Sequence, residues 1–345
     1  MRHLIPTPAQ VDAVQADLSD IPWPSVDADA PAALLSRCPE AAQTPLVAAP
    51  ALASRLGLEA LHLKDERARM GLGSFKALGA AYVIACDAAA GTAKGRAYYT
   101  ASAGNHGLSV AAGALAFGAR AVIYLAATVP AAFAARLEGM GAEVRWRGDV
   151  YEDSMEAAKA DAAAEGAVLL SDSSWPGYTK RPWRLMEGYL VLMQEAVAQI
   201  PAPPTHVFLQ AGVGGMAASA AAYARKVWGA GPRIIVVEPD AAPALIASVA
   251  AGRAMTTEGP ASVMGRLDCK EPSLIALKGL SRDASDFMVI SEKEGALGAQ
   301  MAEEAGLPST PSGAAGLAGL IVAAEGDFGL DRTSRVLLIL SEGPE

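Results

Sequence analysis

The segment Val207-Phe208-Leu209-Gln210-Ala211-Gly212-Val213-Gly214-Gly215-Met216 joins an apolar run to a glycine-rich turn, and an alanine-rich stretch follows it. This order predicts a buried strand, a tight loop and a helix. The backbone N–H groups of such a loop can approach an anion at the start of the helix. A purely structural turn explains the pattern about as well. The spacing matches neither the Walker A motif nor Gly-x-Gly-x-x-Gly, which argues against a nicotinamide-dependent oxidoreductase.

On both sides of this segment, strands and helices alternate, which indicates βαβ units and parallel sheets. Residues 1 to about 50 are rich in Pro, Ala and Asp and are expected to wrap the body. The fold class expected is α/β with two doubly wound lobes, a large one of residues 1–67 plus 191–345 and a smaller one of residues 68–190. The expected elements are strands at 61–64, 96–101, 121–126, 207–210, 234–238, 287–290 and 336–340, and helices at 75–88, 106–117 and 131–140.

The composition supports this fold class and limits the partners. The chain has 345 residues, of which 52% are hydrophobic, and a net charge of −9 without a Lys/Arg-rich run. It is therefore expected to bind neither nucleic acid nor a membrane surface, and a small substrate is favoured. Its three cysteines lie far apart, so no disulfide framework is expected. Pro6 interrupts the N-terminus before an apolar signal segment forms, so a cytoplasmic location is expected.

A second loop, Thr100-Ala101-Ser102-Ala103-Gly104-Asn105-His106-Gly107, again joins an expected strand to an expected helix. Its backbone N–H groups at the helix start suit a substrate carboxylate. His106 is explained equally by packing at the helix start, and it has no second ligand nearby in the sequence, so no metal site is expected. The substrate-binding residues expected here are Ser102, Ala103, Gly104, Asn105 and His106.

A lysine follows a third glycine-rich turn, in Gly73-Ser74-Phe75-Lys76. Ser74 is expected to be the N-cap, which places Lys76 in the first turn of the next helix. An ordinary exposed lysine is the plain alternative. An amine in an apolar pocket has a lowered pKa, which makes it a nucleophile and a base, and this is the role expected for Lys76.

Together the three motifs resemble the fold-type II pyridoxal-phosphate enzymes, the tryptophan synthase β-subunit superfamily. Serine and threonine dehydratases and threonine synthases have the same motifs in the same order. The chain is most similar to the diaminopropionate ammonia-lyases, and the resemblance covers roughly residues 45–344. It is carried by Lys64-Asp65-Glu66, Gly71-Leu72-Gly73-Ser74-Phe75-Lys76-Ala77-Leu78-Gly79, Asp172-Ser173-Ser174-Trp175-Pro176-Gly177-Tyr178-Thr179, Leu209-Gln210-Ala211-Gly212-Val213-Gly214 and Val237-Glu238-Pro239-Asp240.

The resemblance implies that pyridoxal 5′-phosphate is the cofactor, held mainly by the large lobe and bound to Lys76 as a Schiff base next to Phe75. It makes Asn105 the partner of the ring hydroxyl, and Gly212, Val213, Gly214, Gly215 and Met216 the phosphate cradle. Ser341 would face the pyridine nitrogen. A neutral hydroxyl there leaves the nitrogen largely unprotonated and weakens the cofactor as an electron sink, which favours prompt β-elimination.

One departure affects the substrate. Ammonia-lyases of this type have an acidic residue in the substrate loop, where this chain has Ala103. The family uses that carboxylate on D-configured substrates and on the second amino group, so the resemblance does not extend to these properties. The loop is instead like that of the dehydratases. Asp172 matches the family's other acid and is the second expected catalytic residue, although a turn or helix cap also explains an Asp there.

The expected activity is α,β-elimination on a small amino acid, which gives a 2-oxo acid and ammonia, in a homodimeric enzyme. Alternatives within the superfamily are β-replacement, threonine synthase-like chemistry and racemisation, because a fold does not decide the reaction. A pyridoxal-phosphate-binding protein without catalytic activity is the alternative outside enzymes.

Overall fold

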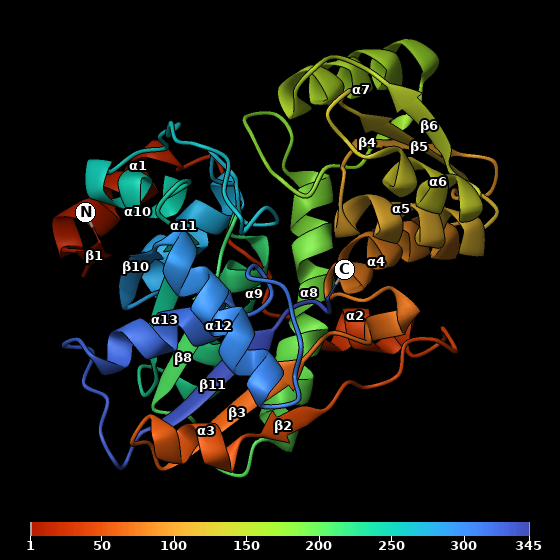
Figure 1. Ribbon diagram of the computed structural model, residues 1–345. Helices are drawn as coiled ribbons and strands as arrows, with labels where there is room; N and C mark the ends of the chain where they lie inside the picture. Colours follow the sequence, from red (N-terminus) through yellow and green to blue (C-terminus); the bar gives the residue numbers. More distant parts are fainter. Residues whose placement is uncertain (1, 345) are drawn as a thin grey trace.

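The computed structural model describes residues 2–344 and contains two separate β-sheets (Figure 1). The large sheet has seven strands, in the order β1 (His3–Leu4), β10 (Asp286–Ile290), β9 (Arg233–Pro239), β8 (His206–Gln210), β11 (Arg335–Leu340), β3 (Ala60–Asp65) and β2 (Leu46–Ala48). The small sheet has four strands, in the order β6 (Glu143–Trp146), β5 (Arg120–Leu125), β4 (Ala97–Ala101) and β7 (Val168–Leu169). The expected α/β fold is confirmed.

The pairing is parallel throughout the small sheet and among the central strands of the large one. Only the edge strands β1 and β2 run antiparallel to their neighbours. Both come from the N-terminal fifty residues, so this segment does more than wrap the body: it completes both edges of the large sheet. The sequence analysis did not anticipate that contribution, nor the short strands β6 and β7.

Helices cover both faces of each sheet, as in a doubly wound fold. The helices are α1 (Pro8–Asp17), α2 (Asp29–Leu35), α3 (Pro50–Arg55), α4 (Lys76–Ala89), α5 (Asn105–Ala116), α6 (Ala131–Gly139), α7 (Tyr151–Glu165), α8 (Lys180–Gln199), α9 (Gly215–Trp228), α10 (Ala244–Ala251), α11 (Leu274–Asp283), α12 (Glu292–Glu304) and α13 (Ala315–Ala324), with a 3₁₀ turn η1 at Arg69–Gly71. Of the helices within residues 2–344, none combines the length and the apolar character that crossing a bilayer requires.

Alternate residues of the strands enter different cores, because successive side chains point to opposite faces of a sheet. In β8, Val207 and Leu209 join the core that contains α9 and α11, whereas Phe208 joins the core that contains α12 and α13. In the small sheet, Tyr98 packs toward α4 and α5, and Tyr99 packs toward α7. Burial on both faces explains why these strands are continuous apolar runs.

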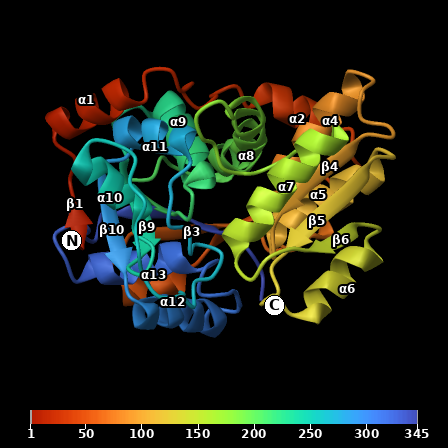
Figure 2. The ribbon, with the colours of Figure 1, turned by 90° about the horizontal axis from the view of Figure 1, so that it is seen from above.

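The long helix α8 lies between the two sheets and packs against both α4 and α9 (Figures 1 and 2). Its inner residues, such as Leu185 and Tyr189, are buried in the core shared by α4 and α9. Tight contact is possible because Gly79 of α4 and Gly188 of α8 leave no side chain at the crossing, where an added Cβ on Gly188 would lie 2.4 Å from the carbonyl oxygen of Leu78. The helix therefore fixes the small sheet against the large one.

Candidate active site

The sequence motifs follow the carboxyl ends of parallel strands. Lys76 comes after β3, the Ser102–His106 loop after β4, Asp172 after β7, the Gly212–Met216 loop after β8 and Ser341 directly after β11. The strand order reverses between β8 and β11 in the large sheet and between β4 and β7 in the small one. Ligands of doubly wound proteins bind outside the carboxyl ends of strands at such points. The topology thus places all five segments where a ligand is expected.

The C-terminal segment after β11 fixes the turn that presents Lys76. The amide of Phe75 donates to the carbonyl of Ser341 at 3.1 Å, and the amide of Gly343 donates to the carbonyl of Gly73 at 3.0 Å. Ser341 is buried, and Lys76 is the first residue of α4. The expected N-cap was wrong: Phe75 occupies the cap position, and the buried hydroxyl of Ser74 has no hydrogen-bond partner within residues 2–344. Backbone pairing with Ser341 and Glu342, instead of capping, sets this turn.

The ammonium of Lys76 forms an ion pair with the carboxylate of Asp172. Its Nζ lies 5.4 Å from the centroid of the Phe75 ring and 5.9 Å from that of Tyr189. Burial lowers the pKa of Lys76, but the charge of Asp172 and its hydrogen bond, together with smaller contributions from neighbouring groups, outweigh it and hold that pKa above its ordinary value. The expected lowering is therefore wrong for the amine in this state, because the pocket is not purely apolar. Burial raises the pKa of Asp172, but the charge of Lys76 and its hydrogen bond are foremost among the opposing contributions that hold that pKa well below its usual range.

Hydrogen bonds connect the Asp172 loop to the glycine loop. The hydroxyl of Ser174 lies 2.7 Å from that of Ser273, at the start of α11, and the amide of Ser273 donates to the carbonyl of Val213 at 3.0 Å. Asp172 itself pairs with Lys76, and the segment that follows it is connected to the loop after β8 through Ser174 and Ser273.

The Ser102–His106 loop presents the start of α5. The hydroxyl of Ser102 accepts from the amides of Gly104 at 3.3 Å and Gly107 at 3.0 Å. Within residues 2–344, the amides of Ala103, Asn105 and His106 donate to no protein acceptor. N–H groups at a helix start are a binding site for anions. This geometry agrees with the carboxylate site expected from the sequence.

His106 is held as a neutral ring. Its Nε2 lies 2.8 Å from the carbonyl oxygen of Leu170, so Nε2 carries the proton and Nδ1 does not. Burial lowers its pKa. Among the described residues, 2–344, no three or more His, Cys, Asp or Glu side chains are grouped so that they could hold a metal ion.

The side chain of Asn105 donates to the carboxylate of Glu342, which also accepts from the hydroxyl of Thr310. Arg266 reaches the same place: its Nη1 donates to the carbonyl of Ala103 at 3.2 Å, and its Nε lies 3.9 Å from Glu342. Sequence analysis missed Arg266, Glu342 and Tyr189. Arg266 and Tyr189 lie outside the motifs, Glu342 directly follows Ser341, and their residue types alone gave no signal.

The glycine loop fits a phosphate group. Within residues 2–344, the amides of Gly212, Gly214 and Gly215 donate to no protein acceptor. Gly214 has a φ of 94°, and an added Cβ there would lie 3.0 Å from Leu245 and 3.1 Å from Ala276. A Cβ on Gly212 would lie 3.0 Å from the sulfur of Cys269. Glycine is thus required for the fold of the loop, and its free amides leave a cradle for an anion at the start of α9. Met216, in the first turn of α9, is buried beneath it.

A cluster of buried charges supports the turn before Lys76. Arg69 forms two hydrogen bonds to Glu66, at 2.7 and 2.8 Å, and two to Glu195 of α8, at 2.9 and 2.7 Å. Lys64 donates to Glu195 at 2.6 Å. The next residue, Met70, has a φ of 52°, which is strained for a residue with a Cβ. The cluster fixes the backbone on one side of that strained residue.

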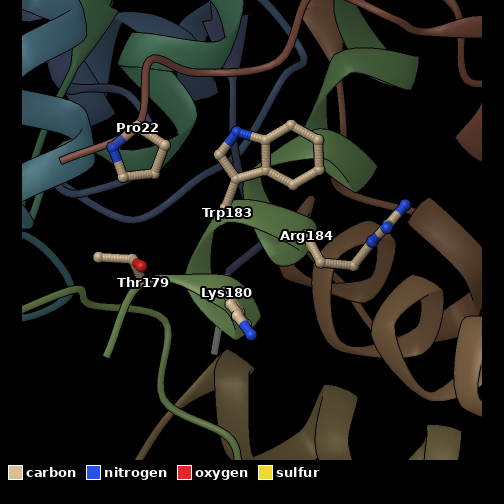
Figure 3. A pocket seen from close by; sticks show the side chains of 5 residues that line it. All are labelled: Pro22, Thr179, Lys180, Trp183 and Arg184. Atoms are coloured by element: carbon tan, nitrogen blue, oxygen red, sulfur yellow. The ribbon is translucent and has the colours of Figure 1, made fainter. Parts of the chain in front are cut away.

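Two surface hollows lie outside the residues predicted for the site. One, of about 320 Å³, is lined by Pro22 and by Thr179, Lys180, Trp183 and Arg184 at the start of α8, as Figure 3 shows. The other, of about 200 Å³, begins at Ser173, directly after Asp172, and continues to Leu274. Neither contains Lys76.

Comparison with known proteins agrees with this geometry. A family model described as pyridoxal-phosphate dependent enzyme matches residues 38–342. The diaminopropionate ammonia-lyase of Salmonella typhimurium is 33% identical over 350 residues, which cover 89% of this chain and 86% of the relative. The crystal structure of the holo form of the Escherichia coli diaminopropionate ammonia-lyase superposes with a TM-score of 0.85 at 29% identity and covers 93% of this chain and 90% of that one.

A second structure of the Escherichia coli enzyme, in complex with an aminoacrylate–pyridoxal-phosphate azomethine reaction intermediate, has a TM-score of 0.83 at 29% identity, and covers 99% of this chain and 91% of that one. The family match spans most of the chain and includes every expected site residue. The cofactor is accordingly pyridoxal 5′-phosphate, for which the glycine loop and the turn at Lys76 have suitable groups. The chain belongs to the family of pyridoxal-phosphate-dependent enzymes.

Proposed function

We propose that this chain, a pyridoxal-phosphate-dependent ammonia-lyase, removes the β-substituent and the amino group of a small L-amino acid, with Lys76 and Asp172 as its acid–base pair. The products are a 2-oxo acid and ammonia. The observation that carries the proposal is the ion pair of Lys76 and Asp172 between the glycine loop and the substrate loop. Two titratable groups held together at the carboxyl edge of the sheets suit proton transfer.

Lys76 is the residue proposed to bind the cofactor aldehyde and, once the substrate amine replaces it, to take the proton from the substrate Cα at its Nζ. A base must lie within hydrogen-bond reach of the proton that it removes. The backbone holds Lys76 in place for this step, because α4 begins at this residue and the amide of Phe75, just before it, donates a hydrogen bond to the carbonyl of Ser341.

Asp172 is proposed to act as the general acid, whereas Lys76 acts as the base. While paired with Lys76 its carboxylate is ionised. When Lys76 no longer carries a positive charge, the pKa of Asp172 rises, since burial then acts without that opposing charge. Asp172 takes up the proton that Lys76 loses as the substrate amine displaces it, and its carboxyl group then gives that proton to the leaving β-substituent, which departs with the electron pair of its bond to Cβ. Hydrolysis by one water then gives the 2-oxo acid and ammonia.

The remaining residues bind and orient. The amides at the start of α5 are proposed to hold the substrate carboxylate, and Gly212 to Met216 to hold the cofactor phosphate. Asn105 and Ser341 would contact the pyridine ring, which requires the amide of Asn105 to exchange its partner Glu342. When bound, the cofactor supplies an electron sink for the negative charge that develops at Cα.

The test combines site mapping with turnover. Purified holoenzyme is reduced with borohydride and digested, and we expect the cofactor on the peptide that contains Lys76. Lys76→Ala should lose both the visible absorbance of the bound cofactor and the release of 2-oxo acid and ammonia from a panel of small L-amino acids. Lys94→Ala, an exposed lysine after α4, is the matched control and should retain both. Cofactor on another lysine would overturn the site assignment.

The same assay separates the alternatives. Product that forms only with an added nucleophile indicates β-replacement, and conversion to the opposite enantiomer indicates racemisation. Cofactor bound at Lys76 without turnover of any amino acid indicates a binding protein without catalytic activity.

The proposal also includes the assembly and the domains. A homodimer in the cytoplasm is proposed, because closed two-fold assemblies are the commonest form of oligomeric enzyme. Residues 68–190 are proposed as the smaller domain, a division supported by the small sheet, which runs from Ala97 to Leu169. Light scattering after gel filtration measures the assembly, and limited proteolysis tests the domain boundaries.

A further inference from the structure

Several buried polar groups near the candidate site have no hydrogen-bond partner. Within residues 2–344, the buried side-chain atoms of this kind are Ser74 Oγ, Thr100 Oγ1, His106 Nδ1, Tyr189 Oη and Gln210 Oε1. A buried hydroxyl without a partner destabilises the folded state, so its presence needs an explanation. Tyr189, in the middle of α8, is 1% exposed and lies beside Lys76, whose Nζ is 5.9 Å from the centroid of its ring.

The ring of Tyr189 is held on both edges. A Cβ added to Gly79 of α4 would lie 2.6 Å from its Cε1, and a Cβ added to Gly215, the first residue of α9, would lie 3.7 Å from its Cε2. Its centroid is also 4.9 Å from that of the Phe75 ring, in an edge contact. The packing thus fixes the ring between α4 and the start of α9, and the hydroxyl cannot turn away to find another partner.

The charges around Tyr189 keep its hydroxyl neutral. Burial, above all, and the carboxylate of Asp172 raise the pKa of Tyr189 more than the charge of Lys76 lowers it. Tyr189 in turn contributes to the raised pKa of Lys76, so the two groups lie close enough to affect each other. A phenol that stays protonated is not a base itself, but its oxygen can still accept a hydrogen bond.

We infer that Tyr189 is a positioning residue for Lys76: its hydroxyl oxygen accepts a hydrogen bond from Nζ once the amine is neutral and has left Asp172. The inference rests on the proposed function, in which Lys76 passes through that neutral form. The hydrogen bond uses an N–H of the amine and leaves its lone pair free for the proton on the substrate Cα. A base that is held in one orientation reacts faster than one that rotates freely.

The kinetic test uses two variants of the holoenzyme. Tyr189→Phe removes the hydroxyl and keeps the ring. Tyr98→Phe is the matched control, because Tyr98 is equally buried but its hydroxyl donates to Asp87 at 2.8 Å. Tyr189→Phe should lower kcat roughly 10- to 100-fold with little change in KM, as expected when a base loses its orientation. The isotope effect on kcat with substrate deuterated at Cα should rise in Tyr189→Phe only, because proton removal becomes slower. An unchanged kcat or isotope effect would overturn the inference.

The stability of cofactor-free protein separates positioning from a structural role. Tyr189→Phe should keep or raise the urea midpoint, because the hydroxyl has no partner among the described residues, whereas Tyr98→Phe should lower it. A fall in both variants would show that the hydroxyl of Tyr189 supports the fold, and would overturn the inference.

A reconstitution test keeps the inference separate from the proposed function. When pyridoxal phosphate is added to cofactor-free protein, the neutral amine of Lys76 must attack the cofactor aldehyde, so visible absorbance should appear more slowly in Tyr189→Phe than in the wild type or in Tyr98→Phe. Equal rates would overturn the inference. Failure of the wild type to release a 2-oxo acid from any amino acid would overturn the proposed function, and the reconstitution rates would still test Tyr189.

Discussion

Lys76 and Asp172, 96 residues apart in the chain, form an ion pair between the first residue of α4 and the loop after β7. The pair joins the turn after the large sheet's β3 to the loop after the small sheet's β7. Each charge stabilises the other in a site where burial alone would favour the neutral forms. The pair is thus a contact between the segments that follow the two sheets.

Asp172→Asn should separate catalysis from cofactor binding. The variant keeps the shape of the side chain but removes its charge and its capacity to give a proton. We expect kcat to fall by roughly 10²- to 10⁴-fold, the usual contribution of a general acid or base. The cofactor should remain bound, because the phosphate cradle lies on another loop. Steady-state kinetics and the visible spectrum of the purified variant measure the two effects.

Asp268→Asn is the control for this variant, because Asp268 lies near Cys269 and pairs with Lys270 instead of Lys76. Its kcat should stay within a few-fold of the wild type. Loss of cofactor from Asp172→Asn, with little effect on kcat per bound cofactor, would assign Asp172 a structural role.

The unfolding of cofactor-free protein should show the pH dependence of the same pair. The folded-state pKa of Asp172 is lowered from 3.8, so its stabilisation is present above that pH and is lost as the pH falls. The folded-state pKa of Lys76 is raised from 10.5, so its contribution is present below that pH and is lost as the pH rises. The stability difference between wild type and Asp172→Asn should therefore be constant from about pH 5 to 9 and shrink below about pH 4. Urea unfolding at several pH values measures it, and a difference that grows on acidification would contradict the pairing.

The parallel strands could be predicted from sequence because they are buried on both faces. Phe208 and Leu209 enter opposite cores, so the strand is an unbroken apolar run. A glycine-rich loop directly after such a run can also be recognised from the sequence. It placed Gly214 and Lys76 after the carboxyl ends of strands. The short strand β7 has two residues and no comparable signal, and it was missed.

The electrostatics of the site could not be predicted in the same way. The pKa of Lys76 depends on Asp172, and the environment of Asn105 depends on Glu342, which is 237 residues away. Arg266 contacts Ala103 across 163 residues. Such contacts are formed by the packing of the two sheets, and no window of sequence contains both partners. The motifs therefore predicted candidate site residues but not the groups that lie against them.

Gly214→Val should release the cofactor before it unfolds the protein. A valine at a φ of 94° is strained, and its Cβ would press on Leu245 and Ala276 under the cradle. Gly57→Val is the matched control, because Gly57 has a φ of 70° but no atom within 4 Å of an added Cβ. Cofactor affinity, measured by equilibrium dialysis, should fall at least tenfold in Gly214→Val only. Similar affinities in the two variants would show that the loop is a structural turn.

Arg69→Met should destabilise the fold by about 3–5 kcal/mol, because it leaves the buried Glu66 and the largely buried Glu195 with Lys64 as the only remaining cation of the cluster. Arg55→Met, which removes an exposed arginine paired with Glu304 at 3.2 Å, should cost at most about 1 kcal/mol. Urea unfolding of both variants measures the difference. Equal and small losses would mean that the cluster does not hold the turn before Lys76.

The stereochemical prediction depends on Ala103. Removal of the Cα proton requires a base on the side where the hydrogen points, within hydrogen-bond reach. For an L-amino acid we expect Lys76 to be that base. For the D-isomer the hydrogen points to the opposite side, where the resemblance to the ammonia-lyases would place Ala103, which offers only a methyl group. We therefore expect a strong preference for L-configured substrates.

Ala103→Asp should raise turnover of the D-isomer, and Ala103→Asn, which has the same shape without the base, should not. Release of 2-oxo acid is measured for both enantiomers of the best substrate. Comparable rates in the wild type would mean that Asp172, already beside Lys76, reaches the second side and acts as the base there.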